Sequence, residues 1–350
     1  MAGAQMGIRL FIAVGFLMLG LGLPSLGGVQ AVEKRVAEKR VVQKSKAKPS
    51  TNRSKSAKAK TVKKQTLTKS KRRASGSTAP VSNPGVLAVQ SGSALVVEQA
   101  GGDAIYQKNA AQVVPIASIT KLMTAMVVLD GSPALQVPVT ITDDDVDYLR
   151  GSRSRLHVGS VLSRESALLL ALMSSENRAA NALARHYPGG MPAFIAAMNI
   201  KAQALGMRDT HFEDPTGLTS NNVSTANDLA KMVVAAHKYP LIREFSTTPE
   251  ATVEVGGREM DYRNTNPLVR NASWDVGLSK TGYISEAGKC LVMQARVADK
   301  PVVIVLLDSS GKLTRVGDAN RIKRWMEHTH ASNKSSIHAA AGPQGVRGPG

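Results

Sequence analysis

The sequence predicts a mixed fold of helices and strands, with one compact domain over residues 85–330. Two short apolar segments, "ALVVEQA" and "AIYQK", are typical of a hairpin closed by "GGD". Strand-like segments return after residue 250, in "ATVEV", "WDVGLSKTG", "KCLVMQARV" and "PVVIVLLD". The apolar residues between these two groups follow a helical period. Strands at both ends of a helical insertion predict a single α and β domain.

The helices are predicted from apolar spacing and from residues that start or stop helices. The first opens at Ser118, because the apolar residues at positions 119, 122, 123 and 126 follow the pattern of a packed helix. Four more are "SRESALLLALMSS", "SENRAANALARHY", "MPAFIAAMNIKAQALG" and "STANDLAKMVVAAHKY". Gly206 is placed to end the fourth of these helices, and Ser224 or Thr225 to cap the fifth. A last helix is predicted near "DANRIKRWMEH", followed by a disordered tail over residues 331–350.

The N-terminal residues 1–31 are predicted to be a cleaved secretory signal peptide. Arg9 precedes an apolar run, and the small residues Val29 and Ala31 are placed for signal peptidase. The alternative is a retained membrane anchor. It is the weaker of the two, since the apolar run from residue 10 to 23 is shorter than the roughly 20 residues that a spanning helix needs.

Residues 32–84 are predicted to be a disordered basic linker, because they contain almost no large apolar side chains. Residues 32–73 hold 17 Lys or Arg against two Glu, which accounts for most of the net charge of +19. Residues 74–330 carry a net charge of only +1, so nucleic acid is not an expected partner of the folded domain. The linker is either a plain tether or a contact with an anionic membrane surface or wall polymer.

No metal or other cofactor is expected from the sequence. The histidines lack metal-ligand spacing, and "TDDDVDYLRG" lacks the Gly and the final Glu of a calcium loop, so a solvated turn or cap is the preferred interpretation. Cys290, the single cysteine, excludes an internal disulfide. It lies in an apolar strand and is predicted to be a core residue.

Ser118 and Lys121 are the first candidates for chemistry, since a serine hydroxyl needs a base and a lysine can supply it when its pKa is lowered. Burial at a helix N-terminus and a second nearby cation would both lower that pKa. Lys280, in "GLSKTGYI", offers the second cation, and Ser175 lies at a helix junction in "MSSENRAA". The Ser-x-x-Lys spacing alone is weak, because Ser309 with Lys312 matches it too.

Three motifs in order, Ser-x-x-Lys, Ser-x-Asn and Lys-Thr-Gly, resemble the active-site motifs of penicillin-binding proteins and serine β-lactamases. The resemblance extends through "LGMRDTHFEDPTGLTSNNVSTANDLAKM" and "RNTNPLV" and covers about residues 85–330. The sequence of this region is similar to that of the low-molecular-mass penicillin-binding proteins of type seven, which are D-alanyl-D-alanine endopeptidases. This resemblance implies a β-lactamase/transpeptidase-like fold, with an antiparallel sheet flanked by helices and an inserted helical subdomain.

The resemblance also implies a role for each motif residue. Ser118 would be the acylated nucleophile and Lys121 its base, and Ser175 would pass a proton to the leaving amine. Asn177 would hold the substrate amide. Residues of the third motif, Lys280, Thr281 and Gly282, would line the substrate carboxylate site, with Lys280 and Thr281 binding the carboxylate. The backbone N–H groups of Ser118 and Tyr283 would form the oxyanion hole. Tyr283 replaces a small hydroxyl residue that is frequent there in the wider superfamily.

The reaction class expected from this resemblance is hydrolysis of D-alanyl-diaminopimelyl cross-links of peptidoglycan in the periplasm, inhibited by β-lactam antibiotics. The alternative is a carboxypeptidase that removes terminal D-alanine; those relatives usually add a C-terminal β domain, for which there is no room after Arg324. A class A β-lactamase is disfavoured because no Glu between Asn177 and Lys280 has an Asn four residues later. A non-catalytic binder that acts through the basic linker is the remaining alternative.

Overall fold

A computed structural model describes residues 87–101 and 103–340 of the chain. The chain divides into two units, residues 1–75 and 76–350, and every described residue belongs to the second. The predicted signal peptide (residues 1–31) and the predicted linker (residues 32–84) both lie outside the described residues. Within the described part, no helix is both long enough and apolar enough to cross a membrane.

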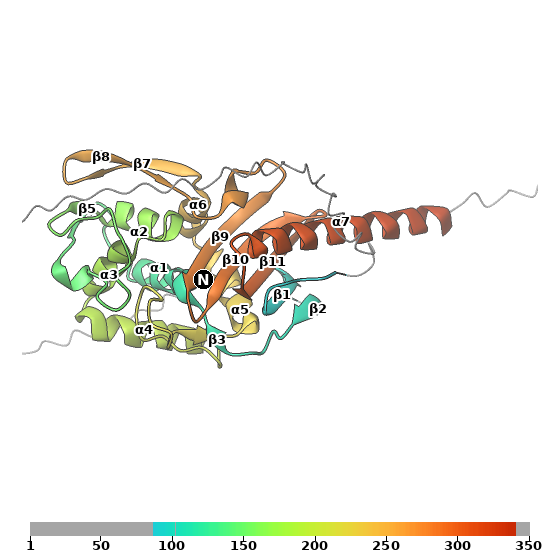
Figure 1. Ribbon diagram of the computed structural model, residues 1–350, viewed down its shortest axis with the longest axis horizontal. Coiled ribbons are helices and arrows are strands. Elements are labelled where there is room, and N and C mark those ends of the chain that lie inside the picture. The colour runs from blue at the N-terminus through green and yellow to red at the C-terminus, as the bar shows by residue number, and fades with distance from the viewer. Residues whose placement is uncertain (1–86, 102, 341–350) are drawn as a thin grey trace, which may run out of the picture. The chain divides into compact units, whose positions relative to one another are not determined.

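A five-stranded antiparallel sheet forms the centre of the domain, with the strand order β2-β1-β11-β10-β9 (Figure 1). Its strands are β1 (Ser93–Glu98), β2 (Ala104–Lys108), β9 (Asp275–Ile284), β10 (Gly288–Val297) and β11 (Lys300–Ser309). The predicted N-terminal hairpin is therefore confirmed, and β1 pairs with the last strand in the sequence. This pairing joins the two ends of the domain.

Both faces of the sheet are buried, which explains why β10 and β11 are continuously apolar in sequence. On β10, Cys290 and Val292 belong to the core shared with the helices between β2 and β9, whereas Leu291 and Met293 belong to a second core under the C-terminal helix. Burial raises the pKa of the Cys290 thiol to about 11, so the thiol stays protonated at neutral pH. Cys290 is thus a core residue, as its sequence context predicts.

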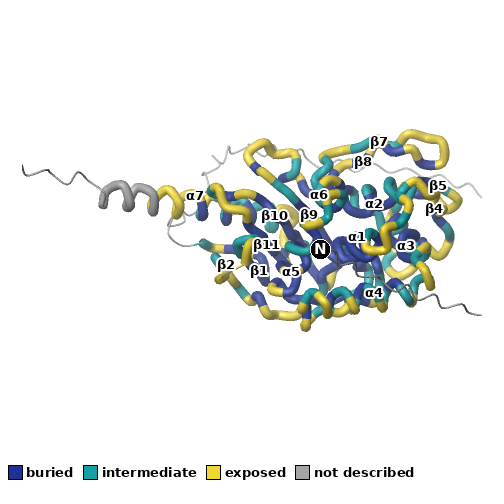
Figure 2. The backbone as a smooth tube through the Cα atoms, turned by 180° about the vertical axis from the view of Figure 1, so that it is seen from behind, coloured by how far each residue is buried: buried dark blue, intermediate teal, exposed yellow. Residues whose placement is uncertain are grey.

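Six helices form the larger core on one face, and α7 covers the other face (Figures 1 and 2). Their bounds are α1 (Thr120–Asp130), α2 (Arg164–Met173), α3 (Asn177–Arg185), α4 (Gly190–Ala204), α5 (Ala226–Ala236), α6 (Pro240–Thr247) and α7 (Thr314–Ala340). Thr225 is the cap of α5, since its side chain accepts a hydrogen bond from the Asp228 backbone N–H. The short helix α6 was not predicted from the sequence.

Shorter elements connect the helices. They are the strand pairs β3 (Val114–Pro115) with β6 (Val223–Ser224), β4 (Pro138–Thr140) with β5 (Val161–Ser163), and β7 (Glu250–Val255) with β8 (Arg258–Arg263), and the 3-10 turns η1 (Ala117–Ile119), η2 (Asp143–Asp145) and η3 (Pro267–Arg270). Gly256 and Gly257 close the β7–β8 hairpin with positive φ angles of 57° and 78°.

The C-terminal helix is longer than the sequence interpretation allowed. The tail was expected to be disordered from residue 331, but α7 continues to Ala340. Residues 331–340 contain no glycine or proline, and the first such residues, Gly342 and Pro343, come just after the helix. The prediction is therefore wrong for residues 331–340, while residues 341–350 lie outside the described part.

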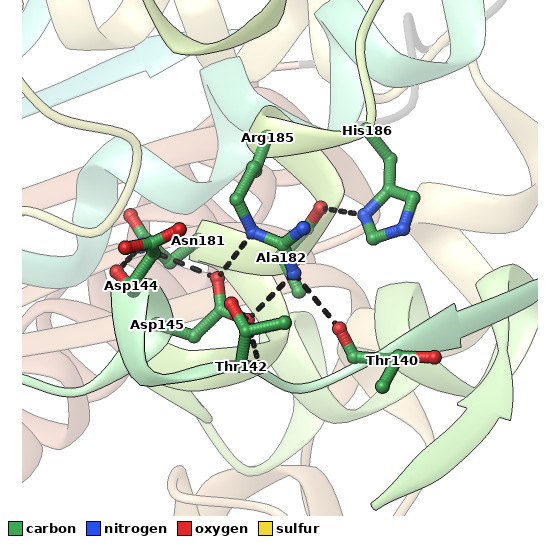
Figure 3. A network of polar contacts seen from close by, with 8 residues as sticks. All are labelled: Thr140, Thr142, Asp144, Asp145, Asn181, Ala182, Arg185 and His186. Carbon is green, nitrogen blue, oxygen red and sulfur yellow. Dashed lines mark hydrogen bonds and ion pairs between the residues drawn. The ribbon is translucent and has the colours of Figure 1, made fainter. Parts of the chain in front are cut away.

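The acidic segment at η2 is a cap, which is one of the two forms expected for it: Asp143 and Asp144 are exposed, and Asp145 is buried. The Asp145 side chain accepts from the Thr142 backbone N–H and forms an ion pair of 2.9 Å with Arg185, although Asp145 is only 3% exposed (Figure 3). Arg185 also donates to the Thr140 carbonyl, and Asn181 donates to the Asp144 carbonyl. These bonds fix α3 against the segment of residues 140–145. They therefore help to orient Asn177 at the start of α3.

Candidate active site

Ser118 lies in the 3-10 turn η1, one turn before the regular helix α1 begins. The residue before it, Ala117, has a φ of +48°, which is uncommon for a residue with a side chain. The Thr120 hydroxyl donates to the Ala117 carbonyl at 2.8 Å and so holds this turn. Ser118 itself is half-buried, which leaves its hydroxyl reachable.

Gly217 packs directly against the Ser118 turn. It has a φ of +81°, and a Cβ atom added there would lie 1.9 Å from the Ala117 carbonyl oxygen. Only glycine fits this position, because a side chain would displace the backbone that carries Ser118. The loop at residue 217 and the candidate nucleophile are therefore built as one unit.

Lys121 is fully buried and donates three hydrogen bonds, which satisfy all three protons of a charged ammonium group. Its acceptors are the Ser118 hydroxyl at 2.8 Å, the Asn177 side-chain oxygen at 2.7 Å and the Thr216 carbonyl at 2.7 Å. Burial lowers the pKa of Lys121 to about 7, although the charges of Asp214 and Glu176 act in the opposite direction. A large fraction of the amine is thus neutral near pH 7 and able to accept a proton.

The turn "DPTG" positions the Thr216 carbonyl. The Asp214 carboxylate accepts from the Thr216 hydroxyl at 2.7 Å and from the Gly217 N–H at 2.6 Å. Asn222 then joins this turn to the nucleophile segment, since its amide donates to the Asp214 carbonyl and to the Thr120 hydroxyl. The third acceptor of Lys121 is fixed in this way by a loop about 95 residues away in the sequence.

Ser175 and Asn177 lie at the junction of α2 and α3, as the sequence predicts. Ser175 has a φ of +64°, so the chain turns sharply before α3 begins at Asn177. The Ser175 hydroxyl accepts a hydrogen bond of 2.8 Å from Lys280. The Asn177 side-chain oxygen accepts the hydrogen bond from Lys121, and the Asn177 side-chain nitrogen donates to the Ser152 hydroxyl at 2.9 Å.

Lys280 on β9 is also buried, at 1% exposure, and donates to Ser175 and to the Thr281 carbonyl at 2.9 Å. Burial lowers its pKa well below the usual value, and the positive charges of Lys121 and Arg315 lower it further. The two amines therefore resist being charged at the same time. The negative charge of a carboxylate bound beside Lys280 would offset this repulsion and stabilise the charged form of Lys280.

The other residues of the third motif lie along the edge of β9. The Thr281 hydroxyl donates to the Thr265 hydroxyl at 2.7 Å. Gly282 packs closely on the Ser118 turn, because an added Cβ atom would lie 3.0 Å from the Ser118 backbone nitrogen. The Tyr283 side chain is 59% exposed, and its backbone follows directly after this close approach.

The structure therefore joins Lys121 to Ser118 and Asn177 by hydrogen bonds, and Lys280 to Ser175. The charge of Lys121 in turn lowers the pKa of Lys280. It also shows five polar partners that sequence reasoning missed: Ser152, Asp214 and Thr216 of one turn, Thr265 and Arg315. The Asp-Pro-Thr-Gly turn signal could have indicated the loop at Asp214. For the other three, no local pattern marks the contact.

Arg315 supports β9 from the other side of the sheet. From α7, it donates to the Gly282 carbonyl at 2.8 Å and to the Cys290 carbonyl at 3.0 Å. These bonds join the helix to neighbouring residues of β9 and β10, because Gly282 and Cys290 are paired in the sheet. The backbone at Gly282 is thus held between Arg315 and the Ser118 turn.

Comparison with known proteins gives consistent matches. A sequence profile of the family described as D-alanyl-D-alanine carboxypeptidase, Peptidase_S11, matches residues 77–311. The chain is 52% identical over 253 residues to the D-alanyl-D-alanine endopeptidase of Pseudomonas aeruginosa, which covers 72% of this chain and 81% of that protein.

Two solved structures share the fold. The Streptomyces K15 DD-transpeptidase matches with a TM-score of 0.64 and 30% identity, covering 68% of this chain and 97% of the other. The ampicillin-bound form of penicillin-binding protein D2 from Listeria monocytogenes matches with a TM-score of 0.60 and 27% identity, covering 69% and 98%. These matches confirm the predicted transpeptidase-like fold.

Replacing Gly217 by alanine is expected to destabilise the domain by about 2–5 kcal/mol, since backbone strain adds to the overlap with Ala117. Gly256→Ala is the matched control, because Gly256 also has a positive φ but open space around it. The control should cost only about 1–2 kcal/mol. Chemical denaturation of both variants measures the difference, and equal losses would show that the packing of Gly217 against Ala117 contributes nothing.

Proposed function

The chain belongs to the D-alanyl-D-alanine carboxypeptidase family Peptidase_S11, and we propose that it is a penicillin-sensitive serine endopeptidase that hydrolyses D-alanyl-diaminopimelyl cross-links of peptidoglycan. The observation that carries this proposal is the hydrogen bond from the fully buried Lys121 amine to the Ser118 hydroxyl. It joins a nucleophile to a base whose pKa is about 7.

Acylation begins when neutral Lys121 takes the proton of the Ser118 hydroxyl. The Ser118 oxygen then attacks the carbonyl carbon of the D-alanyl residue, and the negative charge moves to the carbonyl oxygen. The backbone N–H groups of Ser118 and Tyr283 would stabilise this oxyanion. The close packing of Gly282 on the Ser118 nitrogen supports this role, because it brings the two backbone segments together.

Collapse of the tetrahedral intermediate breaks the C–N bond, and the leaving nitrogen takes a proton through Ser175. The bond between Lys280 and Ser175 supports this relay, since it holds the serine hydroxyl oriented. Asn177 would bind the substrate amide. Lys280 and Thr281 would bind the carboxylate beside the scissile bond, with Gly282 forming part of the same edge. Water then attacks the acyl-enzyme, with Lys121 as base, and releases Ser118.

The endopeptidase is preferred to the carboxypeptidase because the relative that is 52% identical carries the endopeptidase name. Both reactions release an amine on a D-centre that bears a carboxylate, so the groups that bind this carboxylate do not separate them. β-Lactams are expected to acylate the same serine. The ampicillin-bound relative from Listeria supports this expectation.

Location and the N-terminal segments are part of the same proposal. We expect export to the periplasm through cleavage of the signal peptide, with the basic linker binding an anionic lipid surface or wall polymer. A protein lacking residues 32–84 should keep its hydrolysis of soluble fragments. It should also lose salt-sensitive sedimentation with peptidoglycan sacculi or anionic vesicles, since screening weakens such contacts. Unchanged sedimentation without the linker would exclude this role.

The rate of acylation by ampicillin should depend on pH through the base. Neutral Lys121 is the active form and its pKa is about 7, so the rate should fall about tenfold per pH unit well below pH 7. The second-order rate constant measured between pH 5 and 8, on protein shown to stay folded, checks this. A rate that does not change over this range would argue against Lys121 as the base.

The substrate is tested with purified cross-linked muropeptide dimers, analysed by mass spectrometry. The wild-type protein should convert dimers to monomers without release of D-alanine, and Ser118→Ala should be inactive. Loss of at least about a thousandfold is expected, because removal of the nucleophile removes the covalent route. Release of free D-alanine with intact dimers would instead identify a carboxypeptidase.

A further inference from the structure

A separate pocket opens beyond Thr281, where β9 ends and α7 begins. Its volume is about 640 Å³, and its lining includes Thr265, Tyr283, Lys289, Lys312, Leu313 and Arg315. The pocket adjoins the candidate active site through Thr265, whose hydroxyl accepts the hydrogen bond of the Thr281 hydroxyl. A molecule whose carboxylate is held at Thr281 could therefore extend into this pocket.

Positive charge is concentrated in this pocket. Lys289, Lys312 and Arg315 all line it, and no acidic residue does. In the described part of the chain, none of these three side chains forms an ion pair with a carboxylate. Because residues 74–330 are close to neutral as a whole, this is a local excess of charge that an anion would balance.

Two of the three cations are held in place by their surroundings. The Lys289 ammonium lies 3.9 Å from the centre of the Tyr283 ring, an arrangement that a cation–π interaction stabilises. Arg315 donates to the Gly282 and Cys290 carbonyls. Lys312 lines the pocket and is exposed. The exposed Leu313 beside it, at 66% exposure, offers an apolar contact for aliphatic carbon atoms.

We propose that this pocket binds a second carboxylate on the leaving peptide strand, with Lys289 and Lys312 as its contacts. This inference rests on the proposed endopeptidase function. A carboxypeptidase releases a single D-amino acid, whose one carboxylate is held at Lys280 and Thr281. Cleavage of a cross-link releases a diaminopimelyl residue inside a peptide, which carries further carboxylates beyond a short aliphatic chain. The pocket supplies charge and apolar surface for that extension.

The pocket is therefore a determinant of substrate class and takes no part in the bond-breaking step. Its lining does not include Ser118, Lys121 or Lys280. Substitutions in it should weaken binding of a cross-linked substrate but leave acylation by ampicillin unchanged. This separation distinguishes a role in binding from general damage to the active site.

The test measures binding without cleavage, by isothermal titration of a cross-linked muropeptide dimer into full-length protein carrying Ser118→Ala. Adding Lys312→Ala or Lys289→Ala should each weaken binding about three- to fivefold, the size expected for one solvent-accessible ion pair. The control is Lys238→Ala, which removes an exposed lysine outside the pocket. A dimer whose leaving strand is amidated at every carboxylate except the one beside the scissile bond should bind more weakly and should not respond to Lys312→Ala.

The outcomes distinguish a failure of the pocket proposal from a failure of the endopeptidase proposal. The inference is overturned if Lys312→Ala and Lys289→Ala behave like Lys238→Ala, if amidation leaves the effect of Lys312→Ala unchanged, or if the dimer does not bind. Amidating the glutamyl carboxylate and the C-terminal carboxylate of the leaving strand separately, with the diaminopimelyl carboxylate beside the scissile bond left free, identifies which one is bound. Ampicillin acylation of Lys312→Ala with Ser118 intact, at the wild-type rate, shows that the fold is preserved. If the wild-type protein releases only D-alanine, the endopeptidase proposal fails while the binding result still decides on the pocket.

Discussion

The buried amine of Lys121 is the constraint on which the rest of the site depends. A charged amine without water must find an acceptor for every proton, and Lys121 finds three in three different segments: Ser118, Asn177 and Thr216. These bonds link the start of α1, the start of α3 and the loop at residues 213–222. The same burial that requires them also lowers the pKa of the amine to about 7. Structure and reactivity thus have one cause, which is the removal of this side chain from water.

The central sheet fixes the position of β9 and of the site residues on it. Because both of its faces are buried, β9 cannot shift without disturbing the core on either side. Its edge residues are also held from two directions, by Arg315 on the α7 side and by the Ser118 turn on the helix side. Lys280 is brought to Ser175 in this way. The same edge leads outward to Tyr283, which lines the cationic pocket, so Lys280 of the candidate site and part of the proposed subsite for the leaving strand lie on one strand.

Local sequence signals predicted most of the fold and the identity of the candidate site. The hairpin, five helices of the insertion and the long strands follow from periodicity and caps, and three short motifs identified Ser118, Ser175 and Lys280. What the sequence did not predict depends on contacts between distant residues. Thr216 meets Lys121 from 95 positions away, and Arg315 meets Gly282 from 33 positions away. The segment of Asp145 was expected to be a solvated turn or a cap, and the burial of this side chain depends on Arg185, 40 positions later. Such pairs exist only in the folded chain.

The most direct test of this account is the titration of Lys121 itself, followed by NMR in protein labelled with ¹³C at the lysine ε-carbon. The Lys121 signal can be assigned by comparison with Lys121→Met. The account predicts that this one signal titrates near pH 7, well below the value of about 10.4 that is ordinary for a lysine in a model peptide. A Lys121 signal that remains that of a charged amine up to pH 9 would contradict the central role given to this side chain as the base.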